Sequence, residues 1–442
     1  MQIDLSRFRG TCTCGRTHEI FVKDILIEEN ALRKLPDKIK NIHKGPNSSI
    51  VVICDTNTYQ AAGKQIEILL PGSEFVILPA NGLRADNIGL ALAKKGILAS
   101  DNPRLLIAAG SCTIHEISRY LAKEFCIPFV SVPTAASCNT YASPVSVINW
   151  NGFKKVLPGV SPVFVLADTL IFAKAPYKLT AAGISAMLGK YTALTDWEIS
   201  HMVTGEYICN RVCEMEMTAL KDVCISINNL KGALQEAGTK EAGTKETGTK
   251  EAYEKLMYAL LLSGVTMQMI DSSKFEGRML SQISGLEDME MNSTSSEVNH
   301  GEKFSLGLMM AIHTCHKIKS SIRNGIYKAI PYDGIAYNLL EVNFRRKSSR
   351  DEIPDTGLEE SFELTNEWEH GSKRPLIAGV LDKLPSEAEL IKLMTAVDCK
   401  SKENYGKPQD ILAPITLRLV PYIRNRAELI RHSKLFKMKN ET

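Results

Sequence analysis

The first 170 residues alternate short apolar runs with stretches of helical periodicity, and this alternation limits the fold more than any other feature of the chain. Apolar strands that alternate with helices are typical of a parallel sheet whose two faces are both covered. We therefore predict an α/β domain of the nucleotide-binding type over residues 1–176. Its expected strands cover 49–55, 74–80, 104–110, 128–134 and 163–169, and its expected helices cover 57–70, 87–98 and 113–125.

Beyond Pro176 the pattern becomes that of helices, with no convincing strand, so residues 177–442 are predicted to form an all-α domain. Between two of its helices lies the tandem repeat EAGTKEAGTKETGTKE (236–251). Recurring Gly disfavours a helix, and the repeat contains no large apolar residue to bury, so we expect a surface loop there. The expected helices are 178–203, 212–235, 251–272, 302–318, 335–347, 386–396 and 410–434.

Composition argues against several functional classes. The chain has 442 residues, of which 44% are apolar, which is enough for two or three domains. Its net charge of +3 is too small to indicate nucleic acid as a partner. No apolar run reaches the roughly 20 residues of a membrane span, and the N-terminus lacks the apolar core of a signal peptide. We expect a cytoplasmic protein that acts on a small molecule, and the sequence leaves a homo-oligomer open.

The eleven cysteines are scattered, and several of them, such as Cys54 and Cys126, lie inside apolar runs. Buried, reduced thiols explain these positions best. Cys12, Cys14 and His18 lie close together in CTCGRTH and could hold a metal ion. Their spacing is not that of a zinc module, and a second ligand pair is missing, so a reduced N-terminal arm is the preferred interpretation.

Two turns rich in small residues follow neighbouring expected strands. Gly110, Ser111 and Thr113 open a helix directly after RLLIAA, an arrangement in which backbone amides can approach a phosphate. The next strand runs into PTAASCNTYASP (133–144). Because ligands of parallel sheets bind at the carboxyl ends of the strands, the two turns predict one shared dinucleotide or nucleotide site. The hydroxyl residues of the second turn are Thr134, Ser137, Thr140 and Ser143.

Two further residues complete the predicted site. Asp55 ends the strand SIVVICD, where a carboxylate can accept hydrogen bonds from an adenosine ribose. Lys155 follows the expected hairpin turn of NGFKKV and can meet a substrate phosphate, although an exposed charged turn explains it equally well. Turn chemistry alone is the alternative explanation for Asp55 and for each small-residue turn.

Taken together, these residues resemble the glycerol-1-phosphate dehydrogenase family, which lies within the iron-containing alcohol dehydrogenase and dehydroquinate synthase class. The similar stretches include DTNTYQAAG, GSCTIHEISRYLA, SVPTAAS, AAGISAMLGKYTALTDW, SGLEDME and HGEKFSLG. The resemblance implies a Rossmann-like N-terminal domain, a helical C-terminal domain and a site for NAD or NADP. It also implies a divalent metal on the helical side and the reduction of dihydroxyacetone phosphate.

The cofactor positions of the family mostly match this sequence, with one departure. Cys112 replaces a Gly of the family's loop, and a side chain there can crowd the pyrophosphate. Lys155 matches a position that is commonly Lys. The matching cofactor residues are Asp55, Gly110, Ser111, Thr113, Thr134, Ser137 and Ser143.

The metal and substrate positions implied by the resemblance do not match. Ala186 stands where the family has an Asp ligand, and Asp288 stands where it has a His ligand. Asn292 replaces a second His, which contacts substrate, and Asn139 replaces a substrate-binding Asp. His300 matches the third ligand, so His300 and Asp288 are expected to be vestigial and the catalytic metal absent.

Loss of the metal removes the Lewis acid that polarises the carbonyl, a contribution of several kcal/mol. Lys190 and Lys155 are the cations expected near the cleft, and Lys190 is predicted to share a helix face with Ala186. We expect an NAD(P)-dependent oxidoreductase, or an enzyme with altered lyase or cyclase chemistry, in which Lys190, Asn139 and Asn292 act on the substrate. The alternatives are a non-catalytic nucleotide-binding homologue and ordinary glycerol-1-phosphate dehydrogenase with an altered metal shell.

Overall fold

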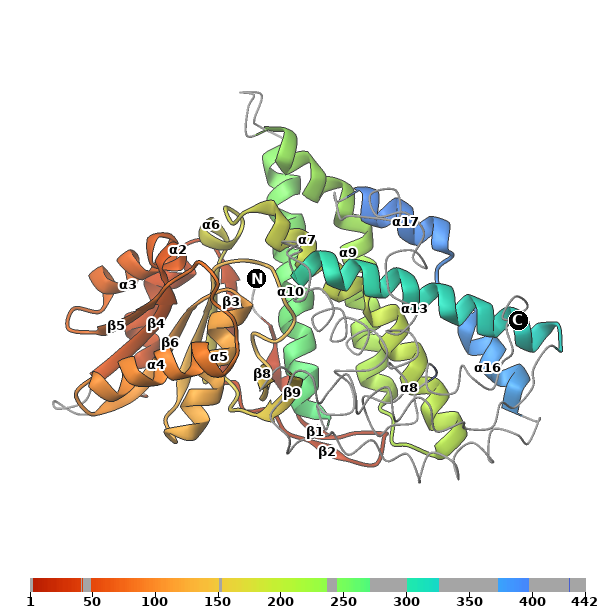
Figure 1. Ribbon diagram of the computed structural model, residues 1–442, viewed down its shortest axis with the longest axis horizontal. Coiled ribbons are helices and arrows are strands. Elements are labelled where there is room, and N and C mark those ends of the chain that lie inside the picture. The colour runs from red at the N-terminus through yellow and green to blue at the C-terminus, as the bar shows by residue number, and fades with distance from the viewer. Residues whose placement is uncertain are drawn as a thin grey trace. The chain divides into compact units, whose positions relative to one another are not determined.

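The computed structural model describes residues 3–40, 42, 49–150, 153–236, 245–270, 300–325, 373–396 and 429. The chain divides into two compact units, whose helices and strands are labelled in Figure 1. Unit 1 comprises Met1–Met187 and Glu214–Ser273, and unit 2 comprises Leu188–Cys213 and Lys274–Thr442. This division differs from the expected boundary after residue 176, because the long helix α10 packs against the N-terminal strand β3.

Unit 1 is built on a parallel sheet of six strands in the order β3-β10-β7-β6-β4-β5. The five strands expected from the sequence are confirmed, and the edge strand β3 is an addition that the sequence reading missed. Its segment DILIE carries charges at both ends and was not separated from its surroundings by a turn signal. The strands are β3 (Asp24–Glu28), β4 (Ser49–Asp55), β5 (Glu74–Leu78), β6 (Pro103–Gly110), β7 (Phe129–Pro133) and β10 (Phe164–Asp168).

Both faces of the sheet are covered by apolar side chains, as the continuous apolar runs predicted. Successive residues of a strand point to opposite faces, so Val52 and Cys54 join one core while Val51 and Ile53 join the other. The first core includes residues of η2 (Ala31–Lys34), α1 (Leu35–Ile39), η3 (Tyr59–Gly63) and α3 (Lys64–Leu69), and the second includes residues of α4 (Asn87–Ala99) and α5 (Cys112–Glu124).

The order of strands changes direction at β4. After β4 the chain adds β5 on one side, and it then crosses to add β6 on the other side. Helices that leave neighbouring strands toward opposite faces open a crevice at the carboxyl edge of the sheet, where α/β proteins bind their ligands. In this protein the change of direction lies between β4 and β6, which end at Asp55 and Gly110.

Smaller elements surround the sheet in unit 1. Two antiparallel hairpins, β1–β2 and β8–β9, flank the expected site residues in the sequence. The hairpin expected around NGFKKV (151–156) is confirmed by the antiparallel pairing of β8 with β9, while residues 151–152 lie outside the described residues. The remaining elements are η1 (Leu5–Phe8), β1 (Gly10–Thr11), β2 (Thr17–His18), α2 (Thr56–Thr58), β8 (Val145–Trp150), β9 (Phe153–Pro158), α6 (Thr169–Phe172), α7 (Tyr177–Leu188), α9 (Asn210–Glu236) and α10 (Lys245–Met269).

The described part of unit 2 is helical, in agreement with the predicted all-α region. Helix α13 packs against α8, α16 and α17. Polar contacts join the same helices, including an ion pair of 2.8 Å between His313 and Glu387. The helices are α8 (Lys190–Thr204), α13 (His300–Arg323), α16 (Arg374–Leu381) and α17 (Glu387–Ala396). The expected helices at 335–347 and 410–434 lie outside the described residues, apart from Leu429.

The expected loop at 236–251 is wrong in its second half. Residues 237–244 lie outside the description, but Lys245–Glu251 form the first turns of α10. Lys and Glu have high helix propensity, and their pairs help to offset the recurring Gly. Glu251 pairs with Lys255 one turn later at 2.7 Å, and Lys250 pairs with Glu29 at 2.7 Å.

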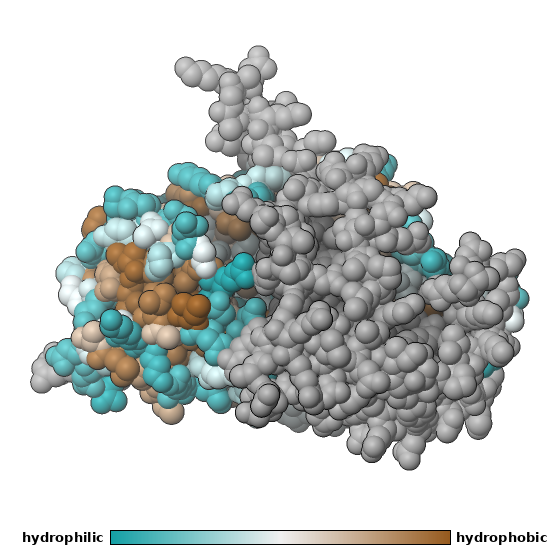
Figure 2. Space-filling model, viewed as in Figure 1, coloured by the Kyte–Doolittle hydropathy of each residue, from teal (hydrophilic) through white to brown (hydrophobic). Residues whose placement is uncertain are grey.

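One surface of unit 1 exposes several apolar side chains over the sheet-bearing part (Figure 2). Exposed apolar groups of this kind are frequent at contacts between protein chains. No described helix is long and apolar enough to cross a membrane. The exposed large apolar residues of this part are Ile68, Ile77, Ile88, Leu92 and Leu98.

The fully buried side chain of His115 connects α5 to the sheet through two hydrogen bonds. The Nδ1 atom of His115 lies 3.0 Å from the carbonyl oxygen of Ser111, and Nε2 lies 2.8 Å from the hydroxyl of Ser131 on β7. Because a carbonyl oxygen only accepts, Nδ1 carries the proton and Nε2 accepts from Ser131. Burial and, to a smaller extent, the positive charge of Arg119 lower the pKa of His115 to about 3, against the opposing effect of the Ser111 hydrogen bond.

This neutral histidine predicts a specific loss of stability in acid. Between about pH 6.5 and 3 the unfolded chain binds a proton at residue 115 while the folded chain does not, so the free energy of unfolding falls as the pH falls. We expect His115→Gln to reduce this slope by up to about 1.4 kcal/mol per pH unit. Urea unfolding of both proteins at several pH values measures it, and parallel pH curves for the two would contradict the assignment.

Candidate functional site

The N-terminus of α5 lies at the sheet crevice with its backbone amides toward the carboxyl edge. Asp55, Asp86 and Asp168 cap helices that follow other strands of the sheet by accepting hydrogen bonds from backbone amides. Ser111, the N-cap residue of α5, makes no such side-chain bond within the described part of the chain. A helix N-terminus without a side-chain cap leaves backbone donors available for an anion.

The turn that follows β7, residues 134–143, lies directly beside this helix terminus. The backbone amide of Thr134 donates to the carbonyl oxygen of Gly110 at 3.0 Å, which extends the β6–β7 pairing past the strand ends. The Cys112 thiol lies 3.8 Å from the hydroxyl of Thr140. The structure therefore brings together the two small-residue turns that the sequence placed on neighbouring strands.

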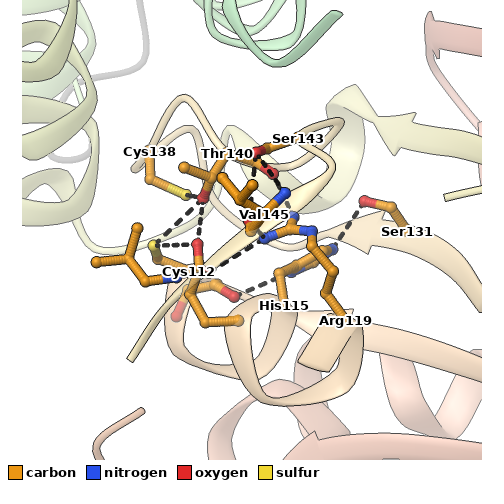
Figure 3. Close-up of polar contacts among 11 residues, drawn as sticks. Cys112, His115, Arg119, Ser131, Cys138, Thr140, Ser143 and Val145 are labelled. Carbon is orange, nitrogen blue, oxygen red and sulfur yellow. Dashed lines mark hydrogen bonds and ion pairs between the residues drawn. The ribbon is translucent and has the colours of Figure 1, made fainter. Parts of the chain in front are cut away.

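A buried ion pair on α5 holds the 134–143 turn in place (Figure 3). Arg119 donates to the Glu116 carboxylate at 3.1 Å, and both side chains are almost wholly buried. Glu116 also accepts from the Thr140 hydroxyl at 2.5 Å and from the Val147 amide at 2.6 Å. Arg119 donates to the carbonyl oxygens of Thr140 and Val145. The two charged side chains thus form hydrogen bonds with backbone and side-chain groups at both ends of the turn.

Two helices approach the same turn so closely that they carry glycine at the contact. A Cβ atom on Gly183 of α7 would lie 2.1 Å from the Ala136 carbonyl oxygen, and one on Gly264 of α10 would lie 2.9 Å from the Ala142 amide nitrogen. From α10, the side-chain amide of Gln268 donates to the Ala142 carbonyl oxygen at 2.6 Å. The turn is therefore enclosed by α5, α7 and α10.

The expected cofactor residues Asp55 and Ser137 both form hydrogen bonds within the protein. Asp55 uses Oδ1 to cap α2, accepting from the amides of Asn57 and Thr58 at 2.8 Å, and Oδ2 has no hydrogen-bond partner among the described residues. The Ser137 hydroxyl lies 2.8 Å from the Tyr141 hydroxyl. Because the Tyr141 hydroxyl donates to the Ala135 carbonyl oxygen at 2.6 Å, Ser137 is the donor to Tyr141.

Ser143 departs from the expected cofactor contact. Its side chain is fully buried, and its hydroxyl both donates to the Val145 carbonyl oxygen and accepts from the Val145 amide, each at 3.2 Å. The hydroxyl is therefore used to close the turn on itself. Thr113, in the first turn of α5, keeps a half-buried side chain, and so does Ser111.

Cys112 stands where the resemblance implies a Gly. Its thiol lies near the side chains of Glu116 and Thr140 (Figure 3). The neighbouring Cys138 thiol and burial both raise the pKa of Cys112, so this residue is a neutral thiol at physiological pH. A neutral thiol held against Thr140 adds no negative charge beside a phosphate.

Of the expected substrate residues, Asn139 lies at the second turn, where its side-chain amide contacts the Ser263 hydroxyl of α10 at 3.4 Å. Lys155 lies half-buried on β9, opposite Ile148 of β8. Lys190 is the first residue of α8 and is buried. Gly189, with helical φ and ψ values of −60° and −17°, lies between α7 and α8, and the expectation that Lys190 shares one helix face with Ala186 stays a prediction.

The expected metal positions are only partly described. Ala186 lies on α7, three residues after Gly183, which places it near the helix face that meets the 134–143 turn. His300 is the first residue of α13, and its side chain lies outside the described residues. Asp288 and Asn292 also lie outside them.

The sequence reading missed the polar residues that carry the site. His115, Glu116 and Arg119 lie in the stretch TIHEISRYLAKEF, which the sequence analysis assigned to a helix without giving these three side chains a role. All three are buried, and Tyr141 packs edge-on against the His115 ring at 4.7 Å between centroids. The available signal was that Ile114, Ile117 and Leu121 already supply one apolar face, while the charged residues lie where the helix must meet the next turn.

Comparison with known proteins places this arrangement in a family. Residues 26–176 match the family model for iron-containing alcohol dehydrogenase. A glycerol-1-phosphate dehydrogenase [NAD(P)+] of Bacillus licheniformis is 33% identical over 310 residues, which cover 68% of this chain and 72% of the relative. The enzyme of the same name from Bacillus velezensis is 30% identical over 337 residues, covering 72% of this chain and 79% of that protein.

Solved structures agree on the fold. Glycerol dehydrogenase from Schizosaccharomyces pombe superposes with a TM-score of 0.55 at 16% identity, covering 97% of this chain and 91% of that one. Maleylacetate reductase from Agrobacterium tumefaciens gives a TM-score of 0.57 at 12% identity, covering 91% and 90%. The identity to the two Bacillus enzymes, and the share of their length that is covered, show the family. This chain belongs to the glycerol-1-phosphate dehydrogenase family, within the iron-containing alcohol dehydrogenase class.

Proposed function

We propose that this protein binds NAD or NADP at the crevice between β4 and β6 and acts as an oxidoreductase on a small phosphorylated carbonyl or polyol compound without a catalytic metal. The observation that carries the proposal is the N-terminus of α5, which lacks a side-chain cap among the described residues and lies at the strand switch point. The names of the curated relatives, which are NAD(P)+-dependent dehydrogenases, support the same cofactor.

The cofactor pyrophosphate is assigned to the amides of the first turn of α5. The partial positive charge of a helix N-terminus favours a phosphate group, and the hydroxyls of Ser111 and Thr113 lie in the same turn. On the other strand ends, Thr134 and Ser137 border the crevice, and Asp55 offers Oδ2 to a ribose hydroxyl. When bound, the nicotinamide supplies the hydride or accepts it.

The substrate side is assigned to the surface where the 134–143 turn meets α7. Ala186 has no donor atom for a metal, and Asn139 cannot supply the negative charge of the family's Asp. With a carboxylate and an imidazole ligand both replaced, two ligands at most would remain, which makes a poor metal site. We assign polarisation of the substrate oxygen to protein hydrogen-bond donors, with Lys190, Asn139 and Asn292 as the residues for mutagenesis and Lys155 for the substrate phosphate.

We place the protein in the cytoplasm. None of the ten cysteines in the described residues forms a disulfide, which is the usual state in a reducing compartment. Measured turnover distinguishes an enzyme from a non-catalytic nucleotide-binding homologue. Steady-state assays with NADH and NADPH against a panel of phosphorylated ketones and aldehydes provide that decision.

The cofactor assignment predicts a charge effect at Thr113. Thr113→Glu places a carboxylate in the first turn of α5, where it favours the helix but repels a pyrophosphate. We expect the Kd for NAD(P)H to rise by about thirtyfold, which corresponds to about 2 kcal/mol. The isosteric, neutral Thr113→Gln is the matched control and should bind almost as the wild type does.

Calorimetric titration with all four nucleotides measures the effect, and thermal unfolding verifies that the variants are folded. Equal affinities for the Glu and Gln variants would show that the pyrophosphate lies elsewhere. Absence of binding by the wild type at millimolar nucleotide would refute the cofactor itself.

The catalytic proposal predicts that turnover survives chelation. After exhaustive EDTA treatment the rate with the best substrate should change by less than about twofold, because no step depends on a metal Lewis acid. Reduction of dihydroxyacetone phosphate should be slow or undetectable in both states. Circular dichroism before and after EDTA is the control for loss of fold. Activity that disappears in EDTA and returns with added zinc or nickel, while the fold is unchanged, would contradict the proposal and support ordinary family activity.

A further inference from the structure

We propose that the N-terminal hairpin of unit 1 holds a structural zinc ion through the thiolates of Cys12 and Cys14 and the Nε2 atom of His18. The sequence spacing had favoured a reduced arm without metal. The folded hairpin brings the three side chains together, and their donor atoms lie within 4.8 Å of one another. The proposed zinc position is separate from the catalytic metal position whose ligands have been replaced.

The backbone of the hairpin creates this convergence. In the β1–β2 pair, Gly10 is opposite His18, which puts the imidazole beside the start of the turn. The Cys12 amide donates to the Arg16 carbonyl oxygen at 2.9 Å, and the Gly15 amide donates to the Cys12 carbonyl oxygen at 3.0 Å. Gly15 has a φ of +84°, which a residue with a Cβ rarely adopts, so this glycine makes the tight turn directly after Cys14.

The imidazole of His18 is oriented as a metal ligand requires. Nδ1 lies 2.7 Å from the carbonyl oxygen of Met269, at the C-terminus of α10, and the side chain is only 1% exposed. A carbonyl oxygen only accepts, so Nδ1 carries the proton and Nε2 keeps its lone pair. Metal-binding histidines usually donate their other ring N–H to a carbonyl or carboxylate, which fixes the tautomer. The lone pair of Nε2 is therefore on the side of the cysteines.

The distance between one pair of donor atoms matches a tetrahedral zinc site. The Cys14 sulfur lies 3.4 Å from His18 Nε2. In a tetrahedral site with Zn–S near 2.3 Å and Zn–N near 2.05 Å, a sulfur and a nitrogen ligand are about 3.6 Å apart. Two thiolates and a neutral imidazole favour zinc over magnesium or calcium, which prefer oxygen ligands. The fourth position belongs to a solvent oxygen or to a further thiol of the chain.

The site would connect the N-terminal hairpin to the enclosed turn. His18 bonds to the last residue of α10, and Gln268, one residue earlier, accepts from the Phe21 amide at 2.7 Å while it donates to the Ala142 carbonyl oxygen. Zinc at the hairpin therefore fixes the chain segment that reaches the 134–143 turn. This position gives the ion a structural role.

The test is zinc content of the full-length protein after saturation with zinc chloride and removal of loosely bound metal on a desalting column. We expect about one zinc ion per chain in the wild type. Cys14→Ser and His18→Asn should each lower the content about tenfold. The Asn variant keeps an N–H group that can reach the Met269 carbonyl oxygen, so it removes the ligand while preserving the local hydrogen bond. Cys126→Ser, which removes an exposed thiol on the same unit, should keep the wild-type content.

Substitution with cobalt(II) tests the ligand type without any mutation. We expect a thiolate-to-cobalt charge-transfer band and the intense visible bands of a tetrahedral ion. X-ray absorption of the zinc protein should show two sulfur neighbours if solvent is the fourth ligand, or three if another cysteine is. Either count supports the site. A wild type that retains no zinc, a content unchanged in both ligand variants, or a shell made of oxygen and nitrogen alone would overturn the proposal.

Discussion

The buried pair of Glu116 and Arg119 is the interaction on which the site depends. Breaking such a pair by removing one partner costs about 3–5 kcal/mol, because it leaves a charge uncompensated in the interior. Here the two side chains also bond to groups at both ends of the turn between β7 and β8 (Figure 3). Room for the Arg119 side chain requires glycine at position 159, where a Cβ would lie 2.7 Å from its Cγ atom. The pair therefore fixes both the position of the turn and the course of the hairpin that follows.

The same turn is where the separate parts of unit 1 meet. Helix α5 supplies the charges, Gly183 lets α7 reach the Ala136 carbonyl, and Gln268 links α10 to the Ala142 carbonyl. The turn also lies beside the open N-terminus of α5, so that the elements that hold it in place also shape the proposed cofactor crevice. In this protein, rigidity at the turn and binding at the crevice have one structural cause, which is the enclosure of a polar loop by three helices.

Sequence patterns were sufficient for five of the six strands of the sheet, because burial on both faces forces continuous apolar strands such as RLLIAAG. Sequence patterns were insufficient for buried polar residues whose hydrogen-bond partners lie far away in the sequence. Glu116 and Arg119 find their partners at Thr140, Val145 and Val147, more than twenty residues along the chain, so no local spacing reveals them. His18 and Met269 are an extreme case, separated by 251 positions. The helical half of the repeat was missed because the recurring glycines were weighed over the whole repeat, although Lys245–Glu251 contains only one, Gly248.

The central claim is that this member of the glycerol-1-phosphate dehydrogenase family keeps the cofactor half of the site and has replaced the metal half. The most direct measurement is metal-dependent reduction of dihydroxyacetone phosphate by the triple variant Ala186→Asp, Asp288→His, Asn292→His, compared with the wild type. If the claim is right, the variant gains activity that requires added metal, while its Kd for NAD(P)H stays within about twofold of the wild-type value. A wild type that already reduces this substrate in a metal-dependent way, with no gain from the three substitutions, would contradict it.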